Sequence, residues 1–214
     1  MSQILFISLA YLVAYLIGGV PTSFIAGKLK GVDITKHGSG NAGATNALRV
    51  LGTKIGVTVM LLDAFKGVIA ILAGSWIIQY FGHTTDQIYD ITLGVTAILG
   101  HVFSIYLKFK GGKGVATAAG VYALLSPYTL LIALAVFIIT VAISRYVSLG
   151  SIIAAIVLVI SQIVKNYLIN FEQLPILILT IFVALFIIIK HKENIKRLLN
   201  GNENKLVLKK KEKI

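Results

Sequence analysis

Apolar runs of about 20 residues recur along this chain of 214 residues, and a run of that length is what an α-helix needs to cross the hydrocarbon core of a bilayer. The chain is 57% hydrophobic and only 13% charged, with a mean hydropathy of +0.90. A soluble domain usually has about a quarter of its residues charged. We therefore expect an all-α, polytopic integral membrane protein. Its seven predicted transmembrane helices are 4–26, 55–80, 88–107, 115–125, 128–143, 149–168 and 174–189.

The fourth and fifth spans are the least clearly separated, because 115–143 could also be one long helix kinked at Pro127. The sequence "LLSPYT" resembles a turn, and the residue before a proline disfavours helix. A division into two spans also places nearly all of the 20 lysines and arginines on one side of the membrane. With six spans, "FKGGK" and the basic tail would lie on opposite faces.

The basic residues also predict the orientation. Lys165 alone falls on the side opposite to the others, while Lys66 lies inside a span. Because positive charge concentrates on the cytoplasmic side, the N-terminus is expected outside and the C-terminus in the cytoplasm. The basic residues of the tail are expected to attract anionic lipid headgroups, at about 1 kcal/mol each near the surface.

Four polar stretches rich in small residues then fall on the cytoplasmic side. They are "GSGNAGATNALR" (38–49), "KFKGGKGVAT" (108–117), "SRYVSLGS" (144–151) and "HKENIKRLLNG" (191–201). The first contains G-x-G-x-x-G, but a membrane span precedes it where a dinucleotide fold requires a strand. The "GGKG" of the second lacks the Ser or Thr that follows the lysine of a P-loop.

These stretches nevertheless have the composition of anion sites. Small residues let backbone N–H groups approach an anion, and a helix N-terminus adds positive potential. Arg49 and Lys113 can supply full charges. Neutral donors are available from Ser39, Thr45, Asn46, Ser148 and Ser151. The alternative is that the glycines form flexible loops or close helix contacts.

Three further features are polar. Asp63 and Lys66 share a helix face inside the second span, where charges usually meet a partner or a polar cavity, so they form a structural ion pair or part of a site. His101, at the end of the third span, is expected to be structural. His191 and Asn194 lie on one face of a short helix. The chain has no cysteine, and its four histidines and eight acids form no recognisable metal-binding cluster, so no metal is expected.

Taken in order, "GSGNAGATNALRVLG", "LLDAFKG", "GHVFSIYLKFKGGKGVATAAG", "RYVSLGSI" and "HKENIKRLLNG" closely resemble the bacterial acyl-phosphate:glycerol-3-phosphate acyltransferase family, over nearly the whole chain. The resemblance implies a seven-helix membrane enzyme with an outside N-terminus. It implies transfer of a fatty acyl group from acyl phosphate to the 1-position of glycerol 3-phosphate, giving lysophosphatidate and phosphate for phospholipid synthesis. Ala42 and Ser144 depart from the family pattern at positions that are not expected to be essential.

The resemblance also implies the organisation of the chain and its site. A catalytic membrane domain would cover residues 1–195, and a basic cytoplasmic tail residues 196–214. Catalytic residues would be Ser39, Arg49, Lys113, His191 and Asn194. Substrate-binding residues would be Gly40, Asn41, Gly43, Thr45, Asn46 and Ser151, to which the pattern of neutral donors adds Ser148.

No cofactor and no nucleic-acid partner are expected. The expected partners are acyl phosphate, glycerol 3-phosphate, membrane lipid and the soluble enzyme that makes acyl phosphate, and the expected location is the bacterial plasma membrane. Either His191 or a phosphate oxygen of a substrate would take the proton from the attacking hydroxyl, and the phosphate oxygen is favoured. From hydropathy and the anion loops alone, a transporter or flippase of a phosphorylated metabolite is the alternative function.

Overall fold

A computed structural model of the chain describes residues 3–168 and 173–206. Within these ranges the secondary structure is entirely helical, so the predicted fold class is confirmed. The α-helices are α1 (Gln3–Gly19), α2 (Thr22–Leu29), α3 (Ala44–Leu51), α4 (Thr53–Tyr80), α5 (Gln87–Val102), α6 (Val115–Leu125), α7 (Pro127–Ser144), α8 (Val147–Leu168), α9 (Leu174–Lys190) and α10 (Lys192–Leu199). Two 3-10 helices, η1 (Ile34–Lys36) and η2 (Ile105–Leu107), lie in the connections.

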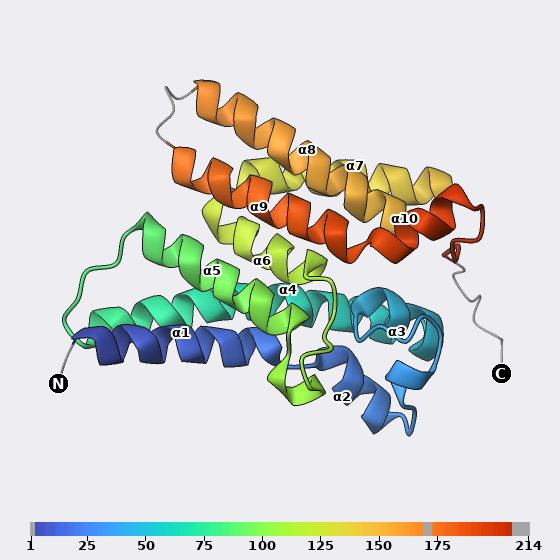
Figure 1. The fold of residues 1–214 in the computed structure, drawn as a ribbon, viewed down its shortest axis with the longest axis horizontal. Helices are drawn as coiled ribbons and strands as arrows, with labels where there is room; N and C mark the ends of the chain where they lie inside the picture. The colour runs from blue at the N-terminus through green and yellow to red at the C-terminus, as the bar shows by residue number, and fades with distance from the viewer. Residues whose placement is uncertain (1–2, 169–172, 207–214) are drawn as a thin grey trace.

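The long helices pack in two groups with α6 between them (Figure 1). Helix α1 contacts α4 and α5, and α4 contacts α6, whereas α7 and α9 both contact α8. Glycines allow the closest approaches: a Cβ on Gly18 would lie 2.2 Å from the carbonyl oxygen of Ala97, and one on Gly120 would lie 1.8 Å from that of Ala64. Close backbone contact through small residues is typical of helices packed in a membrane, where burial of apolar surface gives little driving force.

The number of spans is less regular than the sequence suggests. In the described residues, α4, α5 with η2, α7 and α8 are each long and apolar enough to cross a bilayer. Helices α1 and α2 form a pair bent by 43°, and α9 and α10 a pair bent by 58°. The predicted span 4–26 is therefore broken, because Pro21 has no N–H to continue the helix. Four to six spans are counted in this way, so the total of seven stays a prediction.

Helix α6 is the short member of the bundle. Its 11 residues extend about 16 Å, roughly half the thickness of the hydrocarbon core. The predicted division at Pro127 is confirmed, since α7 begins at this proline. The turn at Ser126 is buried, and polar side chains reach it: the Ser126 hydroxyl donates to Gln162 at 2.9 Å and accepts from Lys165 at 3.1 Å. Irregular backbone at membrane depth requires such protein partners.

The four polar stretches gather at one end of the helices, which we call the loop end (Figure 1). Helix α3, the connection before α6, the connection between α7 and α8, and α10 all lie there. The described N-terminus and the connection between α4 and α5 lie at the opposite end. The basic connections thus share one end, as the positive-inside rule requires if that end is cytoplasmic.

The orientation can be tested with single cysteines, since the natural chain has none. We expect Thr84→Cys, between α4 and α5, to react with a membrane-impermeant thiol reagent in intact cells, because the charge pattern predicts that this connection faces outside. Asn200→Cys, after α10, should react only after the cells are permeabilised. Labelling of intact cells at position 200 and not at 84 would reverse the orientation.

Candidate active site

A large groove opens at the loop end, with a cavity volume of about 1280 Å³. Its polar part is lined by residues from α3, the connection before α6, α8, and the junction of α9 and α10, and it includes five cationic side chains and two acidic ones. Its apolar part runs between α4, α6 and α7, past Met60, Phe65, Leu134 and Phe137. The groove thus joins a cationic site to an apolar channel.

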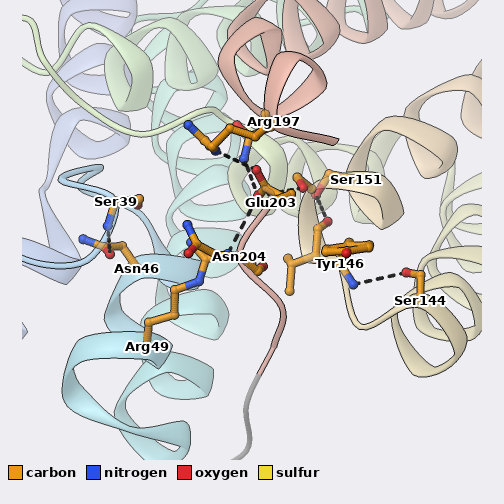
Figure 2. Close-up of polar contacts among 12 residues, drawn as sticks. Ser39, Asn46, Arg49, Ser144, Tyr146, Ser151, Arg197, Glu203 and Asn204 are labelled. Carbon is orange, nitrogen blue, oxygen red and sulfur yellow. Dashed lines mark hydrogen bonds and ion pairs between the residues drawn. The ribbon is translucent and has the colours of Figure 1, made fainter. Parts of the chain in front are cut away.

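Glu203 lies at the centre of the polar contacts at the loop end (Figure 2). One carboxylate oxygen accepts from Nε of Arg197 at 2.7 Å; the other accepts from Nδ2 of Asn194 at 2.8 Å and from the Ser148 hydroxyl at 3.0 Å. Nη2 of Arg49 lies 4.0 Å from that second oxygen. Burial raises the pKa of Glu203, but these hydrogen bonds outweigh it and hold the pKa below its usual value. We call these five residues the Glu203 cluster.

Arg49 has hydrogen-bonding capacity to spare. Its Nη2 donates to the carbonyl oxygen of Asn204 at 3.1 Å, whereas its Nε is buried and has no hydrogen-bond partner among the described residues. Burial lowers the pKa of Arg49, yet a guanidinium stays protonated at neutral pH. A buried cationic donor without a partner is costly, so this side of Arg49 is suited to an anionic ligand.

Lys113 approaches the cluster from the connection before α6. Its Nζ donates to Oδ1 of Asn194, which leaves two of its three donors for other partners. Burial lowers the pKa of Lys113 to about 8, and the nearby Arg197 charge adds to this effect. A bound anion would counter both influences.

His191, at the junction of α9 and α10, is only 4% exposed. Its Nδ1 lies 2.8 Å from the Ile187 carbonyl oxygen, which can only accept a hydrogen bond. Nδ1 therefore bears the hydrogen, and Nε2 is the acceptor in the neutral ring. Burial lowers the pKa of His191 to about 4, and the Lys113 charge acts in the same direction. The ring is neutral at pH 7.

In the first glycine-rich segment, Asn46 is a structural residue of the loop. Its Oδ1 accepts from the Ser39 N–H at 2.8 Å, and its Nδ2 donates to the carbonyl oxygens of Ile34 and His37, each at 3.0 Å. Figure 2 shows the contact between Ser39 and Asn46. Gly40 has a φ of +68°, which favours glycine. The Asn46 amide is thus occupied by the loop itself.

The remaining predicted residues of that segment lie at the groove. Ser39, Asn41, Gly43 and Thr45 all line it, and Gly43 is the N-cap of α3. The first turn of a helix leaves backbone N–H groups without helical partners, so the start of α3 presents donors near this wall. Helix α3 itself was not predicted, because residues 44–51 were interpreted as part of a loop.

The second glycine-rich segment uses its amides differently from what the sequence suggested. The N–H of Gly111 donates to the Val102 carbonyl oxygen at 3.0 Å, and that of Gly112 donates to the His101 carbonyl oxygen at 3.2 Å. These two amides are therefore bonded to the end of α5. In this segment, the donors left for a ligand are those of Lys113 and of the first turn of α6.

Ser148 and Ser151, on α8, are both 5% exposed and line the groove. Ser148 contacts Glu203, while the Ser151 hydroxyl donates to the Val147 carbonyl oxygen at 3.0 Å. The structure thus brings Arg49, Lys113, Ser148, His191 and Asn194 to one end of the groove, although they come from four separate segments.

Arg197 and Glu203 were missed in the sequence. Both lie beyond residue 195, in what was interpreted as a basic tail, yet α10 continues through this position. The Leu206 N–H donates to the Arg145 carbonyl oxygen at 2.7 Å, so the described tail residues pack against the loop end. The available sequence signal was that Glu203 is an acidic residue within an otherwise basic stretch. Residues 207–214 lie outside the described part of the chain.

The described residues contain no group of three or more His, Asp or Glu side chains suited to a metal ion.

Comparisons with known proteins give the family. The model of the family described as "Glycerol-3-phosphate acyltransferase" matches residues 8–201. Proteins of that name from Chlorobium limicola and Trichlorobacter lovleyi are 40% and 45% identical to the chain. The alignments cover 91% of the chain and 94% of the first relative, and 90% and 93% for the second.

Solved structures agree. The crystal structure of PlsY, an integral membrane glycerol 3-phosphate acyltransferase, in its glycerol 3-phosphate form matches with a TM-score of 0.81 and 38% identity. The match covers 94% of this chain and 96% of that one. The lysophosphatidic acid form gives the same TM-score at 39% identity. The chain belongs to the glycerol-3-phosphate acyltransferase family and is a multi-pass integral membrane enzyme.

The Glu203 cluster predicts a loss of stability on Glu203→Gln, because the neutral amide leaves two arginines without their carboxylate. We expect a loss of about 2 kcal/mol, since Arg197 stays partly exposed. For a chain of this size the loss corresponds to about 4–8 °C in Tm. Thermal unfolding in detergent would measure it, with Glu193→Gln, which removes the charge of an exposed acid on the preceding helix α10, as control. Equal Tm values for the two variants would contradict the role of Glu203.

Proposed function

We propose that this enzyme transfers a fatty acyl group from acyl phosphate to the 1-position of sn-glycerol 3-phosphate and releases lysophosphatidate and inorganic phosphate. The observation that supports the proposal most strongly is the groove, in which a cationic end continues into an apolar channel. Acyl phosphate has the complementary shape, with an anionic head and an apolar tail. Glycerol 3-phosphate carries the second anion.

Arg49 and Lys113 are proposed to bind phosphate. Both are cations with free donors at the polar end of the groove, and both can reach the same ligand because Asn194 and the Glu203 cluster hold them together. Hydrogen bonds to charged groups are about twice as strong as neutral ones. Their charges would also offset the repulsion between the two anionic substrates, which opposes the encounter. Ser39, Asn41 and Thr45 supply neutral donors beside them.

The reaction needs one bond to form and one to break. The acceptor hydroxyl attacks the acyl carbonyl carbon, and the bond from that carbon to the phosphate oxygen then breaks. Acyl phosphate is already activated, so alignment of the two substrates is the main contribution, and alignment can lower a barrier by several kcal/mol. The cations would stabilise the negative charge that develops on the carbonyl oxygen and on the leaving phosphate.

The proton of the hydroxyl has two candidate acceptors. One is Nε2 of His191, which bears no hydrogen in the neutral ring. The other is a phosphate oxygen of a substrate. A pKa of about 4 makes His191 a weak base at neutral pH, so the phosphate oxygen is favoured. His191 then acts as a hydrogen-bond acceptor that orients the acceptor substrate.

The proposal extends to the surroundings of the enzyme. The loop end lies on the cytoplasmic side of a bacterial plasma membrane, and a soluble enzyme delivers acyl phosphate to this side. Residues 1–206 act as one catalytic unit, since α10 and Glu203 belong to the site. A transporter would need sites reachable from both faces, whereas the polar stretches here gather at one end, and the family is one of acyltransferases.

The donor can be tested directly with purified protein in detergent. We expect lysophosphatidate to form from glycerol 3-phosphate and palmitoyl phosphate, and not from palmitoyl-CoA. Arg49→Ala should abolish product formation, while Lys54→Ala, which removes an exposed lysine, should leave it near normal. Turnover with palmitoyl-CoA and none with palmitoyl phosphate would refute the proposed donor.

The lowered pKa of Lys113 predicts the alkaline pH dependence. Below about pH 8 the free enzyme has a charged Lys113 that attracts phosphate, and above it the charge is lost. The kcat/KM for glycerol 3-phosphate should therefore fall as pH rises through about 8, because kcat/KM reports groups of the free enzyme. Lys113→Arg keeps its charge at every accessible pH and should remove this fall, whereas Lys108→Arg should not. A fall that persists unchanged in Lys113→Arg would assign it to another group.

A further inference from the structure

A second cluster of buried charges lies beneath the glycine-rich segments, and the proposed mechanism does not use it. Asp63 and Lys66 on α4 and His101 on α5 are 2%, 6% and 7% exposed. Nζ of Lys66 lies 2.8 Å from Oδ1 of Asp63, and Nδ1 of His101 lies 3.7 Å from the same oxygen. We call these three residues the Asp63 cluster.

The Asp63 cluster is tied to the break between α1 and α2. The Thr22 hydroxyl donates to Oδ1 of Asp63 at 2.6 Å, and Nζ of Lys66 donates to the Val20 carbonyl oxygen at 2.8 Å. At the break before Pro21, the Val20 carbonyl oxygen thus accepts from the Lys66 ammonium as well as from the Thr22 N–H at 3.1 Å. The ion pair is therefore fixed on two sides by the bend that leads into the first glycine-rich segment.

On its other side the cluster touches the second glycine-rich segment. A Cβ on Gly112 would lie only 2.1 Å from Nε2 of His101, so the glycine packs directly on the edge of the imidazole. The Gly112 N–H also bonds to the His101 carbonyl oxygen. Asp63, His101, Gly111 and Gly112 line the groove, and they also line a tightly packed crevice together with Val20, Pro21 and Thr22. These four residues therefore form part of the wall of the groove.

The contact between Gly112 and His101 indicates that His101 holds the backbone in place and does not act as a catalytic base. Gly112 covers Nε2 of His101, so the imidazole is poorly placed to reach a substrate hydroxyl as a base. Lys113 follows Gly112 directly in the chain and reaches Asn194 from there. The position of the imidazole ring limits how closely the backbone of Gly112 can approach α5. It thereby also affects where Lys113 and the start of α6 lie.

We propose that Asp63, Lys66 and His101 are positioning residues that hold residues 111–113 in place, so that Lys113 meets the phosphate of the substrate. The inference rests on the proposed function of Lys113. The Asp63–Lys66 pair fixes His101, His101 supports Gly112, and Gly112 sets the position of Lys113. A misplacement of about 1 Å can reduce catalysis by a factor of about 10² even when the altered residue lies away from the chemistry.

A double-mutant cycle tests the link to Lys113. We expect His101→Ala to lower kcat/KM for glycerol 3-phosphate by about 10²-fold, with a raised KM. In a Lys113→Ala background the same change should have little further effect, because the cation that it misplaces is gone. His101→Gln, which keeps a polar group of similar reach, should recover part of the loss and serves in the same cycle if His101→Ala does not fold.

A steric cycle tests the contact itself. Gly112→Ala should lower kcat/KM. The factor by which it lowers kcat/KM should be smaller in the His101→Ala background, where the imidazole no longer meets the new methyl group. Gly111→Ala is the matched control: its Cβ would lie 2.0 Å from the backbone oxygen of His101, which no side-chain change removes. Gly111→Ala should lower kcat/KM by the same factor in both backgrounds.

Asp90→Asn provides a second control. Asp90 accepts from the Ser75 hydroxyl at 2.7 Å and so joins the same two helices, α4 and α5, at their opposite end. It should leave kcat/KM unchanged. Losses from His101→Ala and Lys113→Ala that multiply in the double variant would overturn the inference while leaving the proposed function intact. An inactive wild-type protein would instead overturn the function.

Discussion

A charge inside an apolar helix bundle needs a partner inside the protein, and this requirement shapes the loop end of the structure. The Glu203 carboxylate accepts hydrogen bonds from three side chains and lies near Arg49. Asp63 is paired with Lys66 beside the bend at Pro21. Each cluster joins segments that are distant in the sequence. The charges therefore hold the glycine-rich segments, α8 and α10 around one groove.

The groove explains why a membrane protein needs polar loops at all. A substrate with an anionic head and an apolar tail must keep its tail in lipid while its head meets a water-soluble acceptor. The apolar wall of α4 and α7 and the cations Arg49 and Lys113 satisfy both conditions in one cavity. The glycines have a different part in the two loops. Gly40 permits a left-handed turn, whereas Gly111 and Gly112 allow close packing on the end of α5.

Much of this was accessible from the sequence, because hydropathy and charge act locally. They predicted the all-helical class, the break at Pro127 and the gathering of the polar stretches at one end. The 3.6-residue period placed His191 and Asn194 on one face of a short helix; both do line the groove, with Asn194 on α10 and His191 as its N-cap. Helix α3 was missed because its eight residues form no long apolar run, although their apolar side chains recur at helical spacing. The bend at Pro21 did have a local signal, the stretch "GGVPTS" (18–23), which was interpreted as part of one span.

The contacts of individual side chains could not be predicted, since they join residues far apart in the chain. Asn46 has an amide side chain that could bind a ligand, but this amide is hydrogen-bonded to backbone groups of its own loop. Glu203 contacts Ser148, 55 residues away. No local pattern carries that information.

The central claim is that Arg49 and Lys113 bind phosphate at the polar end of the groove. The most direct measurement is an experimental structure with glycerol 3-phosphate and a non-reactive acyl phosphonate. The account predicts phosphate or phosphonate oxygens within hydrogen-bonding distance of Arg49 and Lys113, with the acyl chain along α4 and α7. Anionic groups bound only at exposed lysines, or an acyl chain outside the groove, would contradict it.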